Sequence, residues 1–206
     1  MLKRRDFIQR ATAFAVAGLV LPACAKTSAK IQGGRGMAKV KVDPKKVAIV
    51  YFSWSGNTKF VAETFAKTLS GAKIAEIKSI KPYATDYGTC CDEAKPECRG
   101  RKSRAVQPIE GLDLSAYDVV LVGSPNWWGT MAPPVRTWIS DNLATLKTKT
   151  VCLFQTHGGG GMQNLSRDFA ELLDGAKVLP AKAYSGSSVR RNATLGEFLT
   201  ERFECA

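Results

Sequence analysis

Residues 46–66 read KVAIVYFSWSGNTKFVAETFA, and this stretch decides the fold because it passes from a strand to a helix through a short turn. Residues 47–52 form an unbroken run of apolar, β-branched and aromatic side chains, which is typical of a strand buried on both faces of a parallel sheet. Beyond the turn, apolar side chains recur at helical spacing at Phe60, Val61, Phe65 and Leu69. The stretch therefore predicts a β-strand that leads directly into an α-helix.

The turn itself, residues 53–58, reads Ser-Trp-Ser-Gly-Asn-Thr and predicts a binding site for an anion. Its hydroxyl and amide side chains, its backbone N–H groups and the positive end of the helix dipole surround one volume, where a phosphate can be held without any Lys or Arg. The turn has neither the Gly-Lys-Ser/Thr ending of a Walker A loop nor the Gly-x-Gly-x-x-Gly of a dinucleotide fold. The alternative is an ordinary turn whose Ser and Thr side chains only cap the helix.

Strands and helices alternate through the rest of the sequence. Further buried strands are expected within residues 114–123 and 150–155, with weaker strands at 72–80 and 176–184. Helices are expected at residues 89–97, from residue 135 onward, at 162–173 and at 193–203. This alternation predicts an α/β fold in which helices cover both faces of a parallel sheet.

Three unusual loops follow the strongest strands. They are residues 53–58, residues 124–131 with the sequence Ser-Pro-Asn-Trp-Trp-Gly-Thr-Met, and residues 156–161 with the sequence Thr-His-Gly-Gly-Gly-Gly. In open parallel sheets, ligands bind at the carboxyl ends of strands near the topological switch point. We therefore expect the three loops to converge on one site.

These loops, in this order, resemble those of the flavodoxin family, in the branch that reads Ser-x-Ser-Gly-Asn-Thr, Pro-x-Trp-Trp-Gly-Thr and Thr-His-x-Gly-x-Gly. The resemblance covers the chain from about Lys46 onward. It implies a short-chain, flavodoxin-like three-layer sandwich with a five-stranded parallel sheet in the order 2-1-3-4-5. It also implies bound FMN and either electron-transfer or flavin-reductase activity.

The resemblance assigns roles to individual loop residues. The first loop corresponds to the phosphate loop, the second to the loop against the ribityl chain and isoalloxazine, and the third to the loop facing the pyrimidine edge. One of the two tryptophans is expected against the flavin and the other packed beneath the loop, while the histidine either stabilises an anionic hydroquinone or simply faces solvent. No catalytic residue or metal ligand is expected, and the cofactor-binding residues are Ser53, Trp54, Ser55, Gly56, Asn57, Thr58, Pro125, Asn126, Trp127, Trp128, Gly129, Thr156, His157, Gly158 and Gly159.

The N-terminal segment, residues 1–25, has the order of an export signal, a basic start followed by a short apolar run. Arg4-Arg5-Asp6-Phe7-Ile8 resembles a twin-arginine signal, and Leu21-Pro22-Ala23-Cys24 resembles a bacterial lipobox in which Cys24 would be lipidated. Simple cleavage near Ala25 and an uncleaved amphipathic helix are the alternatives. Residues 26–44 have a linker composition, so residues 45–206 are expected to form the domain.

The chain is strongly basic, with 30 Lys and Arg against 18 Asp and Glu and a formal net charge of +12. Removing residues 1–24 takes away four cations and one carboxylate, which leaves 26 basic against 17 acidic residues, a net charge of +9. Such a surface favours an anionic membrane surface or an acidic redox partner protein. Nucleic acid is not expected, because the charges are scattered and no nucleic-acid-binding pattern accompanies them.

Six cysteines are present, and setting Cys24 aside leaves an odd number that cannot all pair. A disulfide among Cys90, Cys91 and Cys98 is feasible in an oxidising compartment. A zinc site is not expected, because their spacing is not that of a zinc knuckle and the single histidine is distant. Cys152 lies within a buried strand and is expected to be a small core residue.

These observations favour an exported FMN protein that carries electrons between redox partners. Twin-arginine export suits such a protein, because FMN is assembled in the cytoplasm and this route carries folded cargo. One alternative is an FMN-dependent oxidoreductase that uses NAD(P)H or a quinol and acts on quinones or other small substrates. The other is a flavin-free binding lipoprotein.

Overall fold

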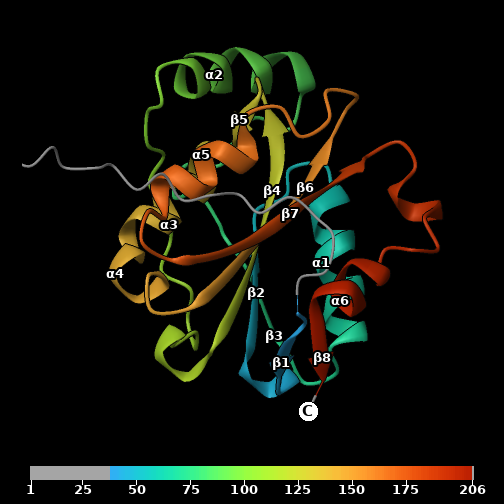
Figure 1. Cartoon of the computed structure of the whole chain (residues 1–206). Helices are drawn as coiled ribbons and strands as arrows, with labels where there is room; N and C mark the ends of the chain where they lie inside the picture. Colours follow the sequence, from blue (N-terminus) through green and yellow to red (C-terminus); the bar gives the residue numbers. More distant parts are fainter. Residues whose placement is uncertain (1–37, 206) are drawn as a thin grey trace, which may run out of the picture.

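A computed structural model describes residues 38–205 of the chain. The expected export signal, with Cys24, and most of the expected linker lie outside the described residues. The main sheet has six strands, which are β2 (Val47–Tyr51), β3 (Lys73–Glu76), β4 (Val119–Trp127), β5 (Thr130–Met131), β6 (Thr150–His157) and β7 (Lys177–Ser185). Five of them are parallel and run in the order β3-β2-β4-β6-β7, with β2 buried along its whole length (Figure 1). This is the α/β architecture that the sequence predicted.

The strand count differs from the expected five. β4 continues through Pro125 to Trp127, and the chain then folds back so that β5 pairs with β4 in the antiparallel direction. A proline and polar residues at the end of β4 do not read as a strand. The stretch at residues 124–131 is therefore a β-hairpin rather than the irregular loop expected from the sequence.

A second, two-stranded sheet joins the two ends of the described chain. β1 (Val40–Val42) pairs in parallel with β8 (Phe203–Cys205), and Val40 lies opposite Phe203. β1 falls within the expected linker, so regular structure begins before the predicted boundary at residue 45. The last helix, α6 (Glu197–Arg202), is shorter than predicted because the chain leaves it to form β8.

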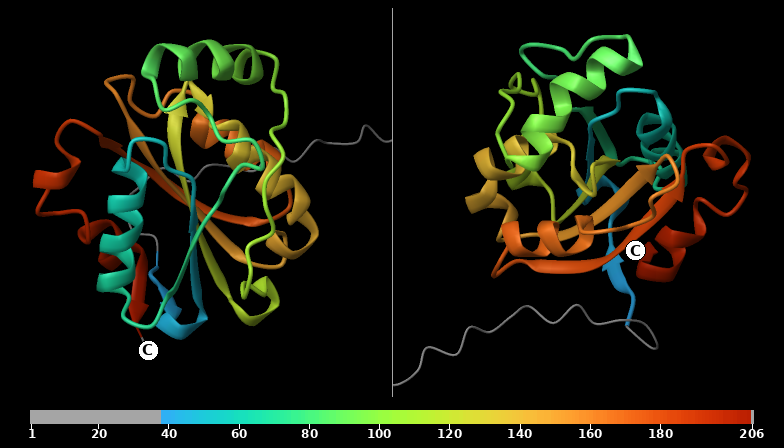
Figure 2. Two further views of the ribbon diagram at one scale, coloured as in Figure 1. Left: turned by 180° about the vertical axis from the view of Figure 1, so that it is seen from behind. Right: turned by 90° about the horizontal axis from the view of Figure 1, so that it is seen from above.

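Helices cover both faces of the main sheet. In Figures 1 and 2, α1 (Asn57–Thr68) and α6 lie on one face, and α3 (Pro133–Asp141), α4 (Leu143–Leu146) and α5 (Leu165–Leu172) lie on the other. Three short 3-10 helices, η1 (Pro44–Lys46), η2 (Leu114–Ala116) and η3 (Val189–Arg191), complete the connections. Within the described range, no helix has the length and apolar content needed to span a bilayer.

Each face of the sheet has its own hydrophobic core. On the α1 side, Phe65 is fully buried, stacks on Phe198 of α6 at 5.6 Å between ring centroids, and meets Phe154 of β6 edge-on at 5.0 Å. Burying one such side chain contributes about 1.5–3 kcal/mol. This packing fixes α1 against β6 and thereby sets the position of the turn that precedes α1.

The remaining helix, α2 (Tyr87–Arg99), lies above the carboxyl ends of the strands in Figure 1. Arg104 holds it there. Its guanidinium lies 3.6 Å from the centroid of the Tyr83 ring, donates to Glu97 at 2.8 Å and to Glu93 at 3.4 Å, and also donates to two backbone carbonyls of the preceding loop. Because Arg104 is only 9% exposed, these contacts are largely shielded from water.

Arg104→Met is expected to lower the free energy of unfolding by about 2 kcal/mol, because it leaves two carboxylates near Tyr83 without their cation. Arg99→Met is the matched control, since Arg99 is exposed at the end of the same helix. The control should change stability by less than about 0.5 kcal/mol. Urea unfolding followed by circular dichroism measures both, and equal losses would contradict this role of Arg104.

Candidate functional site

The first predicted loop joins β2 to α1. Gly56 precedes the helix with a φ of 82°, and no side chain caps the helix N-terminus. The alternative interpretation, that Ser and Thr serve only as caps, is therefore wrong for this helix. The Ser53 hydroxyl is buried and has no hydrogen-bond partner within residues 38–205. Loop 53–58 thus offers the free N–H groups at the start of α1 and an unused hydroxyl at Ser53, which are donors suited to an anion site.

Thr58 connects the first loop to the third. Its hydroxyl lies 2.8 Å from the hydroxyl of Thr156 at the end of β6, and both residues are buried. Since a hydroxyl donates one hydrogen bond and accepts two, the Thr58 hydroxyl can accept from Thr156 and still donate to a ligand. The two loops therefore share one buried polar contact.

The second predicted loop is the hairpin between β4 and β5. Trp128 and Gly129 form its turn with φ values of 48° and 80°, as a type I′ turn requires. A left-handed conformation costs a residue with a side chain roughly 1–2 kcal/mol. The turn leaves the Trp128 side chain 40% exposed, whereas Trp127 meets Phe52 and Tyr83 edge-on at 5.6 and 4.9 Å. Trp127 thus packs beneath the hairpin, as expected for one of the two tryptophans, whereas Trp128 reaches solvent and its contact with a flavin stays a prediction.

Asn126 connects the hairpin to the third loop. Its carbonyl oxygen accepts from the N–H of Gly129 at 3.0 Å, which closes the turn. Its amide donates to the carbonyl of Gly161 at 2.8 Å and to the side chain of Gln163 at 2.9 Å. The structure thus brings the three predicted loops together at one edge of the sheet.

The third loop contains His157 at the end of β6. Its Nδ1 accepts from the N–H of Gly159 at 3.1 Å, so this nitrogen is used within the loop. Gly158 and Gly159 are exposed, and a Cβ added to either would meet no atom within 4 Å. The backbone here is open to close approach by a ligand.

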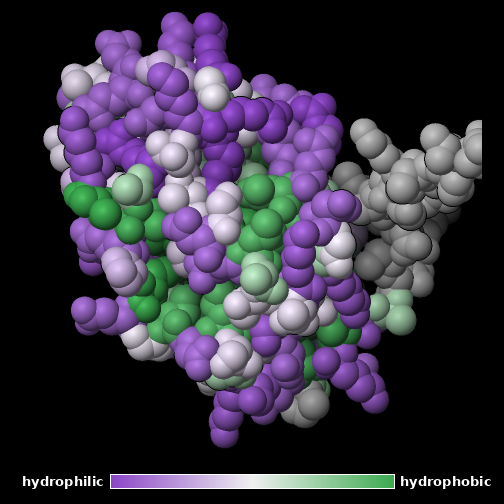
Figure 3. Space-filling view, turned by 90° about the vertical axis from the view of Figure 1, so that its left-hand side faces the viewer, coloured by the Kyte–Doolittle hydropathy of each residue, from purple (hydrophilic) through white to green (hydrophobic). Residues whose placement is uncertain are grey.

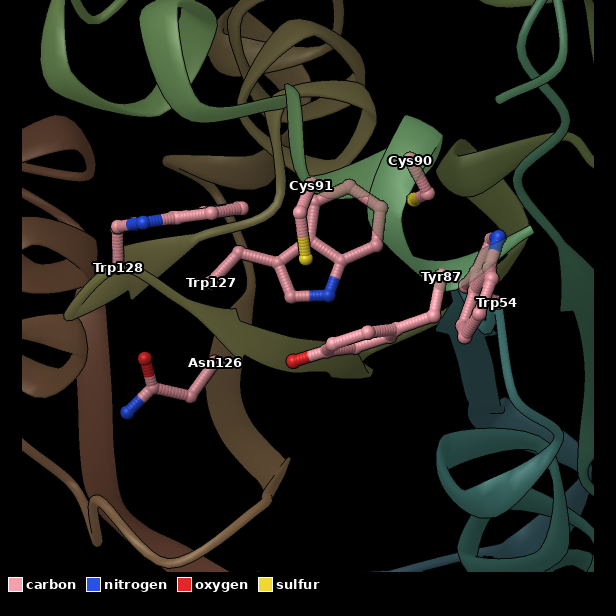
Figure 4. Close-up of a pocket in the computed structure, with 7 residues that line it drawn as sticks. All are labelled: Trp54, Tyr87, Cys90, Cys91, Asn126, Trp127 and Trp128. Carbon is pink, nitrogen blue, oxygen red and sulfur yellow. The ribbon is translucent and has the colours of Figure 1, made fainter. Parts of the chain in front are cut away.

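A hollow of about 150 Å³ lies between the hairpin and α2. Four predicted residues line it, namely Trp54, Asn126, Trp127 and Trp128, and three residues of α2 complete it, namely Tyr87, Cys90 and Cys91. Figure 4 shows the Tyr87 hydroxyl pointing toward Asn126 and the Cys91 sulfur above the Tyr87 ring. The indole N–H of Trp54 donates to the carbonyl of Ala84 at 2.9 Å, which fixes this ring as one wall.

The other predicted residues lie in the surrounding loops and do not line this hollow. Ser53 instead lines a neighbouring hollow of about 250 Å³ beneath the segment that leads to α2, and Trp54 lines both hollows. The sequence predicted a helix at residues 89–97 but not its part in the hollow, because no motif marks α2 as a site element. The signal available in the sequence was local: Tyr87 stands just before the predicted helix, close to the adjacent Cys90 and Cys91.

The cysteines of α2 are free thiols in the structure. The feasible disulfide among Cys90, Cys91 and Cys98 is not formed, because adjacent side chains on a helix diverge and Cys98 lies roughly 10 Å farther along the axis. A disulfide needs Cα atoms within about 7 Å.

Burial raises the pKa of Cys90 to about 11 and that of Cys98 to about 12. Within residues 38–205, no cluster of His, Cys, Asp and Glu is arranged to hold a metal ion.

These thiols predict a loss of stability at alkaline pH. From the ordinary thiol pKa of 9.0 up to about 11, the unfolded chain releases protons that the folded Cys90 and Cys98 retain. The stability that these two thiols contribute is therefore full below pH 9.0 and is lost as the pH rises through about 11 for Cys90 and about 12 for Cys98. The urea midpoint should fall across this pH range in the parent protein and less in a Cys90→Ala, Cys98→Ala double variant. Equal slopes in the two proteins would exclude these thiols as the cause.

The face of the molecule on which α3 and α4 lie, at the left of Figure 1, is not uniform. In Figure 3, hydrophobic residues gather in the middle, and hydrophilic residues cover the upper part of the view, where α2 lies. A fourth segment, which follows β7, brings the guanidinium of Arg190 to 3.5 Å from the Gly56 carbonyl. The sequence predicted an anion site without Lys or Arg, so Arg190 is not among the predicted site residues.

Comparison with known proteins gives consistent results. Residues 46–199 match a family model described as Flavodoxin. The chain is similar to a flavoprotein from Lactobacillus acidophilus NCFM solved in complex with FMN, with 30% identity, a TM-score of 0.60, and coverage of 71% of this chain and 97% of that chain. Structures from Bacteroides uniformis ATCC 8492 (22% identity, TM-score 0.63, coverage 75% and 97%) and Bacteroides eggerthii DSM 20697 (24%, 0.60, 71% and 94%) share the fold.

Proposed function

The chain belongs to the flavodoxin family, and from this premise we propose that it binds FMN at the carboxyl edge of its sheet and carries electrons between redox partners. The observation that carries the proposal is the pairing of an uncapped helix N-terminus with an aromatic hollow, joined by loop 53–58. The first suits a phosphate and the second suits a planar ring.

The residues present fit the cofactor. The buried Ser53 hydroxyl lacks a partner, and a phosphate oxygen would supply one. The Thr58 hydroxyl, which contacts the Thr156 hydroxyl, can donate its own hydrogen bond to a phosphate oxygen. Trp127 and Trp128 line the hollow, which supports our proposal that the chain belongs to the branch with the Trp-Trp-Gly-Thr loop. When bound, FMN would supply one-electron or two-electron chemistry.

The protein's own side chains define how a ring would be held and reached. Trp54 is fixed by its hydrogen bond to Ala84, and Trp127 is fixed by its contacts with Phe52 and Tyr83. Tyr87 is 72% exposed and Trp128 is 40% exposed, so the mouth of the hollow faces solvent. A partner protein can therefore approach the ring edge without opening the fold.

The same exposed mouth favours a second candidate function. A small planar substrate could stack between Tyr87 and Trp128, which would suit an FMN-dependent oxidoreductase that uses NAD(P)H or a quinol and acts on quinones. The third candidate, a flavin-free binding lipoprotein, leaves the unpartnered Ser53 hydroxyl without an explanation.

Two measurements separate these functions. The visible spectrum of the purified protein tests for FMN, and a colourless protein that takes up no added FMN would reject the first two candidates. Anaerobic titration then distinguishes carrier from enzyme. A stable one-electron state without NAD(P)H oxidation is expected for the carrier, whereas bleaching by NAD(P)H with quinone turnover would indicate the enzyme.

We also propose that the protein is exported and tethered to the membrane by a lipid on Cys24. The support is the sequence order of paired arginines, apolar run and lipobox-like Leu21-Pro22-Ala23-Cys24. The net charge of +9 after residue 24 supports an acidic redox partner and an anionic membrane surface. Incorporation of labelled palmitate into the wild type but not into Cys24→Ala tests the tether.

A further inference from the structure

The segment after β7, residues 186–191, forms a fourth wall of the site. The N–H of Gly186 donates to the His157 carbonyl at 2.8 Å. A Cβ on Gly186 would lie only 2.6 Å from the side-chain amide of Asn57, so the segment packs tightly against the first loop as well. Val189 is buried against the α1 side of the core and fixes η3.

This packing places Arg190 at the start of α1. Its guanidinium donates to the carbonyl of Gly56 at a long distance of 3.5 Å, and its central carbon lies 5.1 Å from the centroid of the Phe60 ring. The same nitrogen would lie 3.3 Å from a Cβ built on Gly56. Within residues 38–205, Arg190 makes no ion pair, so most of its five N–H donors are uncommitted.

We infer that Arg190 is a specificity-determining residue that lets this site select a phosphorylated flavin over the same flavin without its phosphate. The inference rests on the proposed FMN site. A phosphate held by the uncapped N-terminus of α1 would lie next to the guanidinium, which matches phosphate geometry and retains its charge at all physiological pH values. Riboflavin ends in a neutral hydroxyl and would gain little from this cation.

The contribution of Arg190 should be moderate rather than dominant, because its side chain is exposed and therefore screened by salt. The neutral donors of loop 53–58 bind either ligand end through hydrogen bonds, whereas the cation acts mainly on the phosphate charge. The ratio of riboflavin to FMN dissociation constants therefore reports on Arg190 more directly than the affinity for either flavin.

The test compares four full-length apo proteins, the wild type, Arg190→Gln, Arg190→Lys and Arg191→Gln, by titrating each with FMN and with riboflavin. Arg191 is the matched control, because it carries the same charge on the next residue but donates to the Ser187 carbonyl at 3.2 Å. Arg190→Gln should weaken FMN binding about tenfold, with riboflavin changed less than about twofold. Arg191→Gln should change both by less than about twofold, and Arg190→Lys should fall between.

The effect of Arg190→Gln on FMN should shrink in 1 M salt, where the Debye length is about 3 Å. Equal effects of Arg190→Gln and Arg191→Gln, an unchanged FMN affinity, or equal losses for FMN and riboflavin would overturn the inference while leaving the FMN site in place. A wild-type protein that binds neither flavin would instead reject the proposed function. Circular dichroism checks that each variant is folded. If Arg190→Gln does not fold, Arg190→Lys is compared with the wild type and Arg191→Gln in its place.

Discussion

Replacing Ser55 and Thr58 together by alanine is expected to weaken FMN binding by about 3 kcal/mol or more, on the order of a hundredfold in Kd or greater. The reason is that each hydroxyl would lose a hydrogen bond to a charged phosphate, which is worth about 1.5–3 kcal/mol. Thr58 is buried, so its bond should contribute the larger share, whereas Ser55 is exposed. Titration of the apo protein with FMN, followed by quenching of flavin fluorescence, gives the dissociation constants.

The control for this pair preserves both hydroxyls. A Ser55→Thr, Thr58→Ser variant should bind FMN within about fivefold of the wild type, because its donors remain. It also separates ligand binding from stability, since Thr58→Ala leaves the buried Thr156 hydroxyl without its partner at 2.8 Å. An alanine double variant that binds FMN as tightly as the wild type would show that loop 53–58 does not hold the phosphate.

The contrast between loop 53–58 and α2 shows what the sequence could predict. The loop lies between a buried strand and a helical repeat within one continuous stretch, residues 46–66. This local pattern therefore predicts both the strand-to-helix fold and the binding of an anion. α2 contributes Tyr87, Cys90 and Cys91 to the hollow through long-range contacts, chiefly those of Arg104. Such contacts leave no periodic signal in the sequence.

The same distinction explains the strands. β2, β4 and β6 were predicted because strands buried on both faces read as apolar runs. β5 and the continuation of β4 depend on the left-handed turn at Trp128 and Gly129, and β1 depends on pairing with β8 at the far end of the chain. Arg190 belongs to this second class, since only the packing of the segment after β7 brings it to Gly56.

The site also depends on Gly123, a strand glycine that directly precedes the second loop. In β4, Gly123 pairs in register with Tyr51 of β2 on one side and with Phe154 of β6 on the other. A Cβ built on Gly123 would lie 2.4 Å from the Phe154 ring and 2.7 Å from the Cβ of Tyr51. Real Cβ contacts are not this short, so a side chain here must displace the ring or a neighbouring strand. Phe154 is fully buried against Phe65, which leaves it no free space.

Gly123→Ala is therefore expected to lower the free energy of unfolding by about 3 kcal/mol, at the upper end of the usual cost of overpacking a core. Gly88→Ala adds the same methyl group to the first turn of α2, where its nearest neighbour would be 3.4 Å away. Because alanine favours the helix, this control should leave stability unchanged or raise it by up to about 1 kcal/mol. Urea unfolding compares the two, and a Gly123→Ala protein as stable as the wild type would show that β4 and β6 can separate at this point. Since β4 carries the hairpin and β6 carries Thr156, such freedom would also mean that the loops of the site are not held in place by the sheet.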